Sequence, residues 1–221
     1  CNFDCIYCYE TNSNLYMKKK EIESIKKFVG KLLKDINELA ICWYGGEPLM
    51  AFDVVKELSE FFINECKKNN VKYMANMVSN GYLIDENICQ EIKKCKIGSL
   101  QITIDGNRET HDKRRPLKNN NKESTFDKIV ENIKLISKSV DEVMVRVNVD
   151  KENKNVDFKN ITEMFKKFEN VHFYCGYVES LEKTESELYE LCLTQNETIE
   201  FDLKEENVIN KYFFPVVDNG N

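Results

Sequence analysis

The chain has 221 residues, of which 42 % are hydrophobic and 32 % are charged, and its formal net charge is −6. This length can bury one substantial core, so one large domain is expected. An acidic chain without a basic stripe excludes the usual nucleic-acid-binding surface. No apolar run approaches the roughly 20 residues of a membrane span, and no signal peptide is recognisable. We therefore expect a cytoplasmic protein that binds neither nucleic acid nor membrane.

The chain opens with three closely spaced cysteines, Cys1, Cys5 and Cys8, in the pattern C-x3-C-x2-C. Iron–sulfur clusters are held by Cys thiolates, and three of them can wrap a four-iron cubane while leaving one iron without a protein ligand. An open position on a metal is typical of a reactive site. The spacing favours such a cluster, whereas zinc binding and purely structural thiols remain as alternatives.

Alternating and apolar runs predict five strands separated by helices along the rest of the chain. The predicted strands are Leu39–Tyr44, Val71–Val78, Leu100–Ile104, Val143–Val149 and Val171–Val178. The predicted helices are Met17–Asp35, Asp53–Lys67, Asp85–Lys94, Thr125–Ser137 and Phe158–Phe168. The polar stretch from Asn107 to Lys122 is predicted to be a long loop, and such loops are often functional.

Strands that alternate with helices indicate an α/β protein with a parallel sheet. We predict a partial (β/α)6 TIM-like barrel whose first strand is missing or truncated, because the cysteines stand where a first strand would pass to its helix. Residues 1–178 would form this core domain. Residues 179–221 would form an acidic helix and linker; positions 179–206 alone hold ten Asp or Glu and two Lys, a net charge of −8.

Unusual residues follow the predicted strands, where the active sites of such sheets lie. Gly45-Gly46-Glu47-Pro48 comes directly after one strand and Ser79-Asn80-Gly81 after the next. Two glycines let the backbone approach a ligand closely, and a glutamate can accept hydrogen bonds from an ammonium group. An ordinary strand-to-helix turn is the alternative for the glycine motif taken alone.

Together these motifs resemble the radical S-adenosylmethionine (SAM) enzymes. The matching residues, in chain order, are Cys1, Cys5 and Cys8 with Tyr7, then Gly45–Pro48, Ser79–Gly81, Gln101–Gly106, His111, Asp112 and Arg115. The last stretch resembles the branch that modifies peptides and proteins, which includes anaerobic sulfatase maturases and thioether-forming peptide maturases with SPASM domains. The chain ends about where those relatives begin their SPASM domain.

The resemblance implies a [4Fe–4S] cluster on the three cysteines and SAM on the open iron. Reductive cleavage of SAM would give a 5′-deoxyadenosyl radical that removes hydrogen from a substrate side chain, with no catalytic side chain identified in this stretch. A peptide or protein substrate and an electron donor such as flavodoxin or ferredoxin are the implied partners. The substrate reaction would be peptide maturation with thioether formation, which we prefer, or formylglycine formation.

The resemblance also assigns roles to residues that would bind SAM. The backbone of Gly45 and Gly46 and the Glu47 carboxylate would hold its ammonium group, with Pro48 stiffening the turn. Arg115 would bind its carboxylate, since a guanidinium fork suits that group. Further expected contacts are Asn80, Thr103 and Arg146.

Other polar residues are expected to serve structure. We expect Asp105 to shape its turn and His111 to act as a structural hydrogen-bonding residue. Arg146 could instead form an internal salt bridge, because a buried arginine is rare without a partner. The competing hypothesis for the whole chain is a non-catalytic zinc- or iron-binding module that serves structure or electron transfer.

Overall fold

The computed structural model describes residues 1–8, 10, 16–119, 123–178 and 190–201. Its five strands form one sheet in the order β1-β2-β3-β4-β5, and every neighbouring pair is parallel. The strands are β1 (Glu38–Trp43), β2 (Lys72–Ser79), β3 (Ile97–Thr103), β4 (Glu142–Val149) and β5 (Val171–Tyr177). The predicted α/β class and parallel partial barrel are thereby confirmed, with each strand within a few residues of its predicted position.

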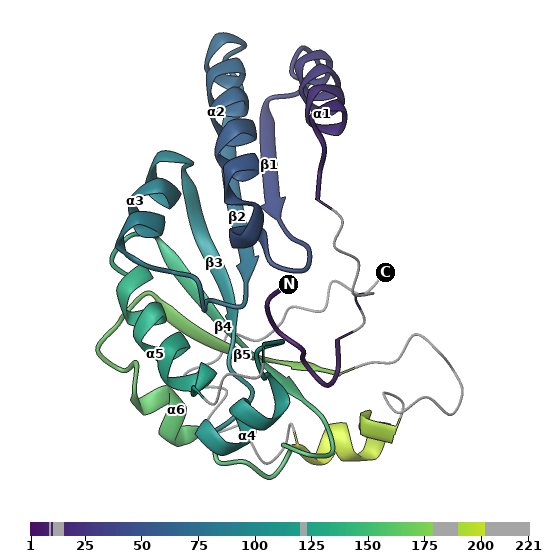
Figure 1. The fold of residues 1–221 in the computed structure, drawn as a ribbon, viewed down its shortest axis with the longest axis vertical. Helices are drawn as coiled ribbons and strands as arrows, with labels where there is room; N and C mark the ends of the chain where they lie inside the picture. The colour runs from purple at the N-terminus through teal and green to yellow at the C-terminus, as the bar shows by residue number, and fades with distance from the viewer. Residues whose placement is uncertain (9, 11–15, 120–122, 179–189, 202–221) are drawn as a thin grey trace.

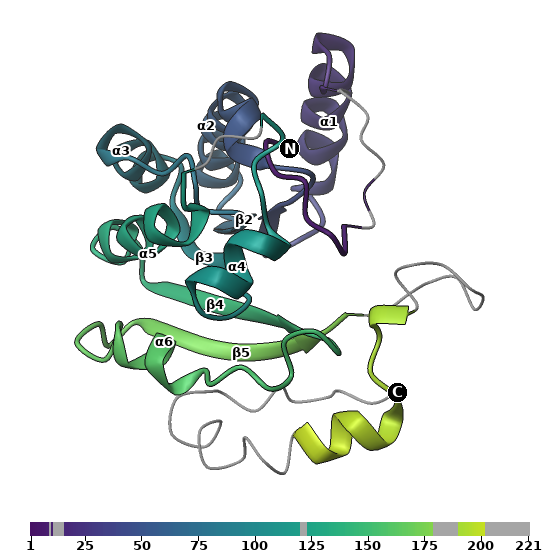
Figure 2. The ribbon, with the colours of Figure 1, turned by 60° about the horizontal axis from the view of Figure 1, so that its bottom comes forward.

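One helix precedes the first strand and others connect successive strands, and the helices lie along one side of the curved sheet (Figures 1 and 2). They are α1 (Lys19–Leu32), α2 (Phe52–Lys68), α3 (Glu86–Lys94), α4 (Arg108–Arg114), α5 (Thr125–Ile136) and α6 (Lys159–Glu163), with a short 3-10 helix η1 at Pro48–Ala51. Side-chain caps begin several of them. Asp85 accepts a hydrogen bond from the backbone of Ile88 and Ser124 accepts one from Asp127, which satisfies otherwise unpaired N–H groups.

The two faces of the sheet differ because successive side chains of a strand point to opposite sides. Ile102 of β3 and Val145 of β4 are fully buried and pack with α5 in one hydrophobic core. The opposite, inner face carries polar side chains. Thr103 lies beside Arg146, which in turn lies beside Tyr174. In β3 and β4, apolar side chains therefore lie on the helix-covered face and polar side chains lie on the inner face.

The stretch predicted as a long loop after β3 contains α4, so that prediction was wrong for residues 108–114. Asn107 caps the helix by accepting a hydrogen bond from the Thr110 backbone. Two of its side chains, His111 and Arg114, are completely buried. Because the buried side chains of α4 are polar, the helix has no apolar periodicity that the sequence could show.

The last predicted helix was too long: α6 ends at Glu163 instead of Phe168. Beyond it, the Phe165 N–H donates to Thr162 and the Phe168 N–H donates to Phe165, three residues back rather than four. These tighter turns replace the α-helix. They bring Phe165 against Phe168 and Phe173, with ring centroids 6.4 Å and 5.7 Å away.

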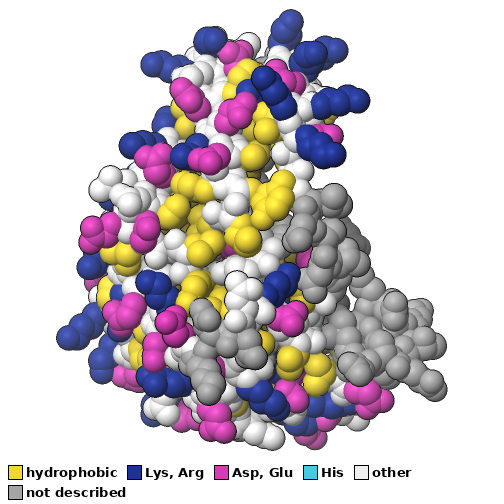
Figure 3. Space-filling view, in the orientation of Figure 1, with side chains coloured by type: hydrophobic (Ala, Val, Ile, Leu, Met, Phe, Trp, Pro, Cys, Tyr) yellow, Lys and Arg dark blue, Asp and Glu magenta, His cyan; other side chains and the backbone are white. Residues whose placement is uncertain are grey.

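Charged side chains crowd the outer ends of α1 and α2, whereas hydrophobic side chains gather in the middle of the same face (Figure 3). No helix within the described residues is long and apolar enough to cross a membrane. Much of the acidic segment predicted at 179–206, namely 179–189 and 202–206, lies outside the described residues, as does the remainder of the chain to residue 221.

The carboxyl ends of β1 and β2 point at the N-terminus of the chain, where Cys1 lies (Figure 1). Parallel strands bring the loops that follow them to one edge of the sheet. The first eight residues, here called the cysteine loop, therefore meet the glycine motif after β1 and the polar turns after β2 and β3.

Candidate functional site

The cysteine loop is fastened to the residues that end and follow α4. The backbone contacts are Asp4 N to Pro116 O (2.8 Å), Ile6 N to Arg114 O (3.1 Å), Lys118 N to Asn2 O (3.0 Å) and an antiparallel bridge between Phe3 and Leu117. Phe3 is 3 % exposed and belongs to the main core. A loop without regular structure thus acquires a fixed position from a short helix that the sequence did not reveal.

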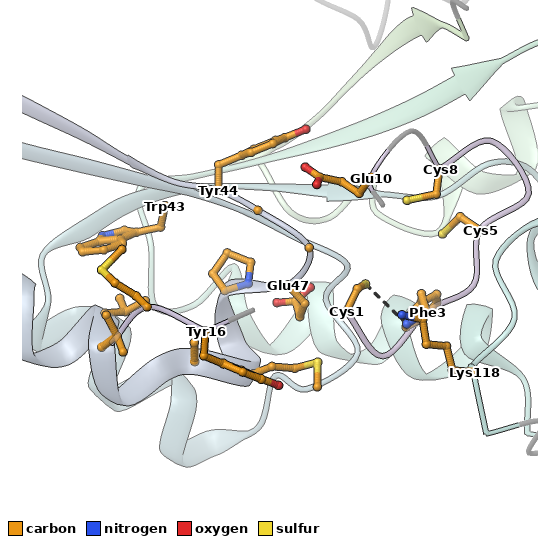
Figure 4. A pocket seen from close by; sticks show the side chains of 18 of the residues that line it. Cys1, Phe3, Cys5, Cys8, Glu10, Tyr16, Trp43, Tyr44, Glu47 and Lys118 are labelled. Atoms are coloured by element: carbon orange, nitrogen blue, oxygen red, sulfur yellow. Dashed lines mark hydrogen bonds between the residues drawn. The ribbon is translucent and has the colours of Figure 1, made fainter. Parts of the chain in front are cut away.

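The three cysteine sulfur atoms point toward one hollow, as Figure 4 shows. A turn in which the Cys8 N–H donates to the Cys5 carbonyl oxygen at 3.1 Å brings two of them together. Cys1 and Cys8 are exposed and Cys5 is half-buried. Within the described residues, no group of three or more His, Cys, Asp and Glu side chains is gathered closely enough to hold a single metal ion.

Two cavities share the cysteine loop as a wall. The outer cavity, about 420 Å³, lies toward η1 and the start of α2. The inner cavity, about 450 Å³, lies over the inner face of the sheet. Among the predicted site residues, the inner cavity is lined by Cys1, Cys5, Cys8, Gly45, Gly46, Asn80, Thr103, Arg115 and Arg146, whereas Glu47 and Pro48 line the outer cavity. The fold brings all of these predicted residues to one place.

The glycine motif permits a close approach to the first cysteine. Gly45 has φ +146°, a backbone conformation that L side chains rarely adopt. A Cβ built on Gly46 would lie 3.1 Å from the Cys1 backbone nitrogen and 3.3 Å from the Cys1 Cβ. The cysteine loop therefore packs directly against Gly46, and a side chain at this position would displace the loop.

Glu47 is a buried carboxylate that ties the β1 turn to the end of β2. Its Oε1 accepts hydrogen bonds from the Leu49 backbone (3.0 Å) and the Ser79 hydroxyl (2.8 Å), and its Oε2 accepts one from the Asn80 backbone (2.7 Å). Burial raises the pKa of Glu47, and these three hydrogen bonds oppose that shift. Three of the roughly four acceptor positions of a carboxylate are filled, so one remains for a further donor.

Asn80 joins the same assembly from the end of β2. Its Nδ2 donates to the Asn2 side-chain oxygen at 2.7 Å and lies 3.8 Å from the Cys1 sulfur. Its Oδ1 accepts a hydrogen bond from the Tyr82 backbone. The Asn80 side chain therefore ties the end of β2 to the cysteine loop.

Arg115 is buried, and its guanidinium has no hydrogen-bonding partner among the described residues. It is 4 % exposed, its Nε is a buried donor without a hydrogen bond, and its guanidinium forms no ion pair or hydrogen bond within the described residues. Its planar group lies 5.4 Å from the centre of the Phe3 ring. Burial of a charge without a close partner is costly, and the charges of Asp105 and Glu47 offset part of that cost.

Arg146 and Asn148 share the inner face of β4, as their spacing predicts. The Arg146 Nε donates to the Asn148 side-chain oxygen at 2.7 Å. No ion pair of Arg146 occurs in the part of the chain that the structure describes, so the alternative of an internal salt bridge is not realised there. Thr103, 9 % exposed, stands beside Arg146 on β3.

A buried network that sequence reasoning missed supports the cysteine loop from below. Arg114 donates through Nη1 and Nη2 to both carboxylate oxygens of Asp150, at 2.8 Å and 2.7 Å. Its Nε lies 3.7 Å from the Asp105 carboxylate, and its guanidinium lies 5.1 Å from the centre of the Tyr7 ring. The adjacent residues Arg114 and Arg115 were the available signal in the sequence, but only Arg115 was predicted to be functional.

Tyr7, the residue before the third cysteine, is held by this network. Its hydroxyl donates to the Asp105 carboxylate and accepts a hydrogen bond from Asn148 Nδ2 at 3.1 Å. Burial and the neighbouring Asp105 charge raise the pKa of Tyr7 well above its usual value. The tyrosine therefore stays neutral and anchors the loop to the ends of β3 and β4.

Asp105 and His111 lie where structural residues were expected. The Asp105 side chain accepts a hydrogen bond from the Asn148 backbone at 3.0 Å, and the Asp105 N–H donates to His111 Nδ1 at 3.2 Å. Burial, with the charges of Arg115 and Arg114, lowers the pKa of His111 well below its usual value. His111 is thus a neutral, fully buried residue that fixes the turn after β3.

Comparison with known proteins identifies the constellation. A family model described as the radical SAM superfamily matches residues 1–165, well over half of the chain. The chain is 30 % identical over 186 residues to a cysteine-type anaerobic sulfatase-maturating enzyme of Clostridium novyi, a match that covers 78 % of this chain and 46 % of the relative. It is 31 % identical over 114 residues to the radical SAM cyclopropyl synthase TigE of Paramaledivibacter caminithermalis, covering 44 % of this chain and 23 % of that protein.

The fold also matches solved structures. Native anSMEcpe with bound AdoMet and the Kp18Cys peptide superposes with a TM-score of 0.76 at 22 % identity, covering 96 % of this chain and 59 % of that one. This likeness shows the fold alone. The chain spans less than half the length of the curated relatives it matches.

Proposed function

Because this chain belongs to the radical SAM superfamily, we propose that it is the core of an enzyme that uses a [4Fe–4S] cluster and SAM to modify a side chain of a peptide or protein. Residues 1–178 would form that core domain, with residues 179–221 as an acidic connecting segment. A cytoplasmic location and an electron donor such as flavodoxin or ferredoxin complete the proposal.

Cys1, Cys5 and Cys8 are the proposed cluster ligands. They supply three thiol donors from one anchored loop, and their sulfur atoms converge on one hollow (Figure 4). When bound, the cluster and SAM supply reductive cleavage of SAM to methionine and a 5′-deoxyadenosyl radical that removes hydrogen from carbon. The chain would orient these groups. Arg115 opposes the effect of burial on the pKa of Cys5, which favours the thiolate needed for metal binding.

The observation that carries the proposal is the orphaned guanidinium of Arg115. SAM bears a carboxylate and an ammonium group on one carbon. Arg115 would hold the carboxylate, and the ammonium group would be held by the Gly45–Gly46 backbone and the remaining acceptor position of Glu47. Thr103 and Asn80 line the inner cavity together with Arg115, Gly45 and Gly46, and Glu47 lines the adjoining outer cavity. A buried cation that has no hydrogen-bonding partner within the described ranges and faces a cavity fits an anionic ligand better than it fits a folding role.

The choice of a peptide or protein substrate is supported by the relatives, which include a sulfatase-maturating enzyme. Within that class, peptide maturation with thioether formation is preferred, and formylglycine formation is the second candidate.

The test is anaerobic reconstitution of the full chain with iron and sulfide, followed by SAM and dithionite. The product 5′-deoxyadenosine is measured by mass spectrometry. Cys5→Ala should abolish product, whereas Cys42→Ala, which removes an exposed cysteine that lines neither cavity, should leave the rate within about twofold of the parent. A cluster-loaded parent that binds SAM and forms no more product than Cys5→Ala would support the non-catalytic module instead.

A further inference from the structure

Arg146 is held in a fixed pose on the inner face of the sheet. Its Nε is bound to Asn148, and its guanidinium lies 6.0 Å from the centre of the Tyr174 ring. It also lies directly against Gly176 of β5, where a Cβ would stand 2.6 Å from Nη2 and 2.8 Å from Cζ. The absence of a side chain at Gly176 makes room for this pose, so residues of β4 and β5 together fix the guanidinium over the inner cavity.

The guanidinium edge that faces the cavity has no carboxylate partner. Arg146 is half-buried and lines the inner cavity, and it forms no ion pair with any residue in the described ranges. Arg114 shows how this fold treats a structural arginine, since both of its terminal nitrogens bind Asp150. Arg146 therefore differs from Arg114 and resembles Arg115, which also forms no ion pair among the described residues.

The inner cavity thus contains two arginines that need anions. Arg115 stands beside the cysteine loop and, on the proposed function, takes the single carboxylate of SAM. Arg146 stands on β4, where Tyr174 of β5 is its register partner. The two guanidinium groups are held by different elements, so Arg146 can bind a second anion, from another molecule, while Arg115 holds SAM.

We propose that Arg146 recognises a carboxylate of the peptide substrate, which makes it a specificity-determining residue. This inference rests on the proposed function and adds the substrate class: a peptide with an acidic group close to the residue that reacts. A planar, pre-organised guanidinium binds a carboxylate through two parallel hydrogen bonds. Because Asn148, Tyr174 and Gly176 already restrict the side chain, little conformational entropy is lost on binding.

A carboxylate can come from an acidic side chain or from a peptide C-terminus, and the test separates these sources. Three N-acetylated hexapeptides serve as probes: one with glutamate beside a central serine and an amidated end, one with glutamine there and an amidated end, and one with glutamine and a free C-terminal carboxylate. Their dissociation constants are measured by calorimetry on the cluster-loaded, SAM-saturated full chain under anaerobic conditions.

The parent should bind at least one carboxylate peptide more tightly than the amidated glutamine peptide by about tenfold or more, the size expected for hydrogen bonds to a charged group. The peptide that binds more tightly shows whether Arg146 takes the carboxylate of an acidic side chain or that of a C-terminus. In Arg146→Gln this preference should fall to within about twofold, whereas Arg146→Lys should retain part of it. Equal affinities for all three peptides in the parent, or no binding of either carboxylate peptide, would overturn the inference.

A structural role must also be distinguished, because Arg146 bonds Asn148, which bonds Tyr7 in the cysteine loop. SAM affinity and 5′-deoxyadenosine formation without peptide are therefore measured in Arg146→Gln. If Arg146 acts on the substrate, the loss of carboxylate preference in this variant should exceed any loss of SAM affinity by at least about threefold. A loss of SAM affinity in Arg146→Gln as large as the loss of carboxylate preference, or larger, would assign this arginine to SAM instead and overturn the inference. Failure of the parent to form 5′-deoxyadenosine would count against the proposed function, not against Arg146.

Discussion

Two neighbouring arginines should respond in opposite ways to the same substitution. Arg114 and Arg115 are both buried. Arg114 is paired through two hydrogen bonds to Asp150, whereas the Arg115 side chain has no such pairing in the part of the chain that the structure describes. Replacement of either by methionine keeps much of the apolar stem and removes the charge. Arg114→Met leaves Asp150 as a buried carboxylate without its partner, whereas Arg115→Met leaves no broken hydrogen bond among the described residues.

The magnitudes follow from that difference. Loss of one partner from a buried ion pair costs about 3–5 kcal/mol, so Arg114→Met should lower the free energy of unfolding by that amount. For Arg115→Met, relief of an unpaired buried charge offsets the lost attraction to Asp105 and Glu47, and we expect a change of less than about 1 kcal/mol. Its affinity for SAM should instead fall by about 3 kcal/mol, roughly 150-fold, because two charge-assisted hydrogen bonds are lost.

Urea unfolding of the cluster-free proteins measures the free energy of unfolding. The affinity for SAM is measured by titrating the reconstituted proteins with SAM and recording electron paramagnetic resonance of the reduced cluster. The iron content of each sample is the control for an intact cysteine loop. Arg115→Met that is as unstable as Arg114→Met, or that binds SAM as tightly as the parent, would refute the assignment of Arg115 as a ligand-binding residue.

Three further substitutions test the supporting contacts. Gly46→Ala should slow SAM cleavage by about 10- to 100-fold because its Cβ displaces the cysteine loop, while the matched change Gly30→Ala, on α1 with nothing within 4 Å, should leave the rate unchanged. Glu47→Gln should lower the free energy of unfolding by about 1–3 kcal/mol, measured in urea, because an amide donor would face the Asn80 N–H. A free energy of unfolding in Glu47→Gln equal to that of the parent would contradict this. His111 stays neutral in the folded protein, so below pH 6.5 only the unfolded chain gains its proton. The free energy of unfolding should therefore fall by up to about 1.4 kcal/mol per pH unit between pH 6.5 and 5.5, and His111→Gln should remove this part of the pH dependence; an unchanged slope would show that His111 is not responsible.

The sequence reveals those parts of the fold in which burial is apolar. The strand at Val143–Val149 and the helix at Thr125–Ser137 follow from periodicity, because their buried residues are hydrophobic and regularly spaced. The helix α4 does not, since it buries His111 and Arg114, and polar burial leaves no periodic apolar signal. The same limit explains why the short helix α6 was predicted too long, because Phe165 and Phe168 continue a helical spacing that the backbone does not follow.

The candidate site divides in the same way. The three cysteines and the Gly45–Pro48 motif could be found because residue type and spacing express their chemistry locally. The pairing of Arg114 with Asp150, and of Tyr7 with Asp105, joins residues that are 36 and 98 positions apart. No local pattern contains such partners, so only the three-dimensional structure shows which arginine is structural.

Mössbauer spectroscopy of the full chain reconstituted with iron-57, recorded with and without SAM, tests the central claim most directly. Three cysteine ligands leave one iron of a [4Fe–4S] cluster for SAM. Addition of SAM should therefore change the signal of about one iron in four, while the other three keep tetrahedral sulfur coordination. A cluster in which no iron responds to SAM, or a preparation that binds zinc in place of a cluster, would contradict the assignment of Cys1, Cys5 and Cys8 to a cluster with an open iron.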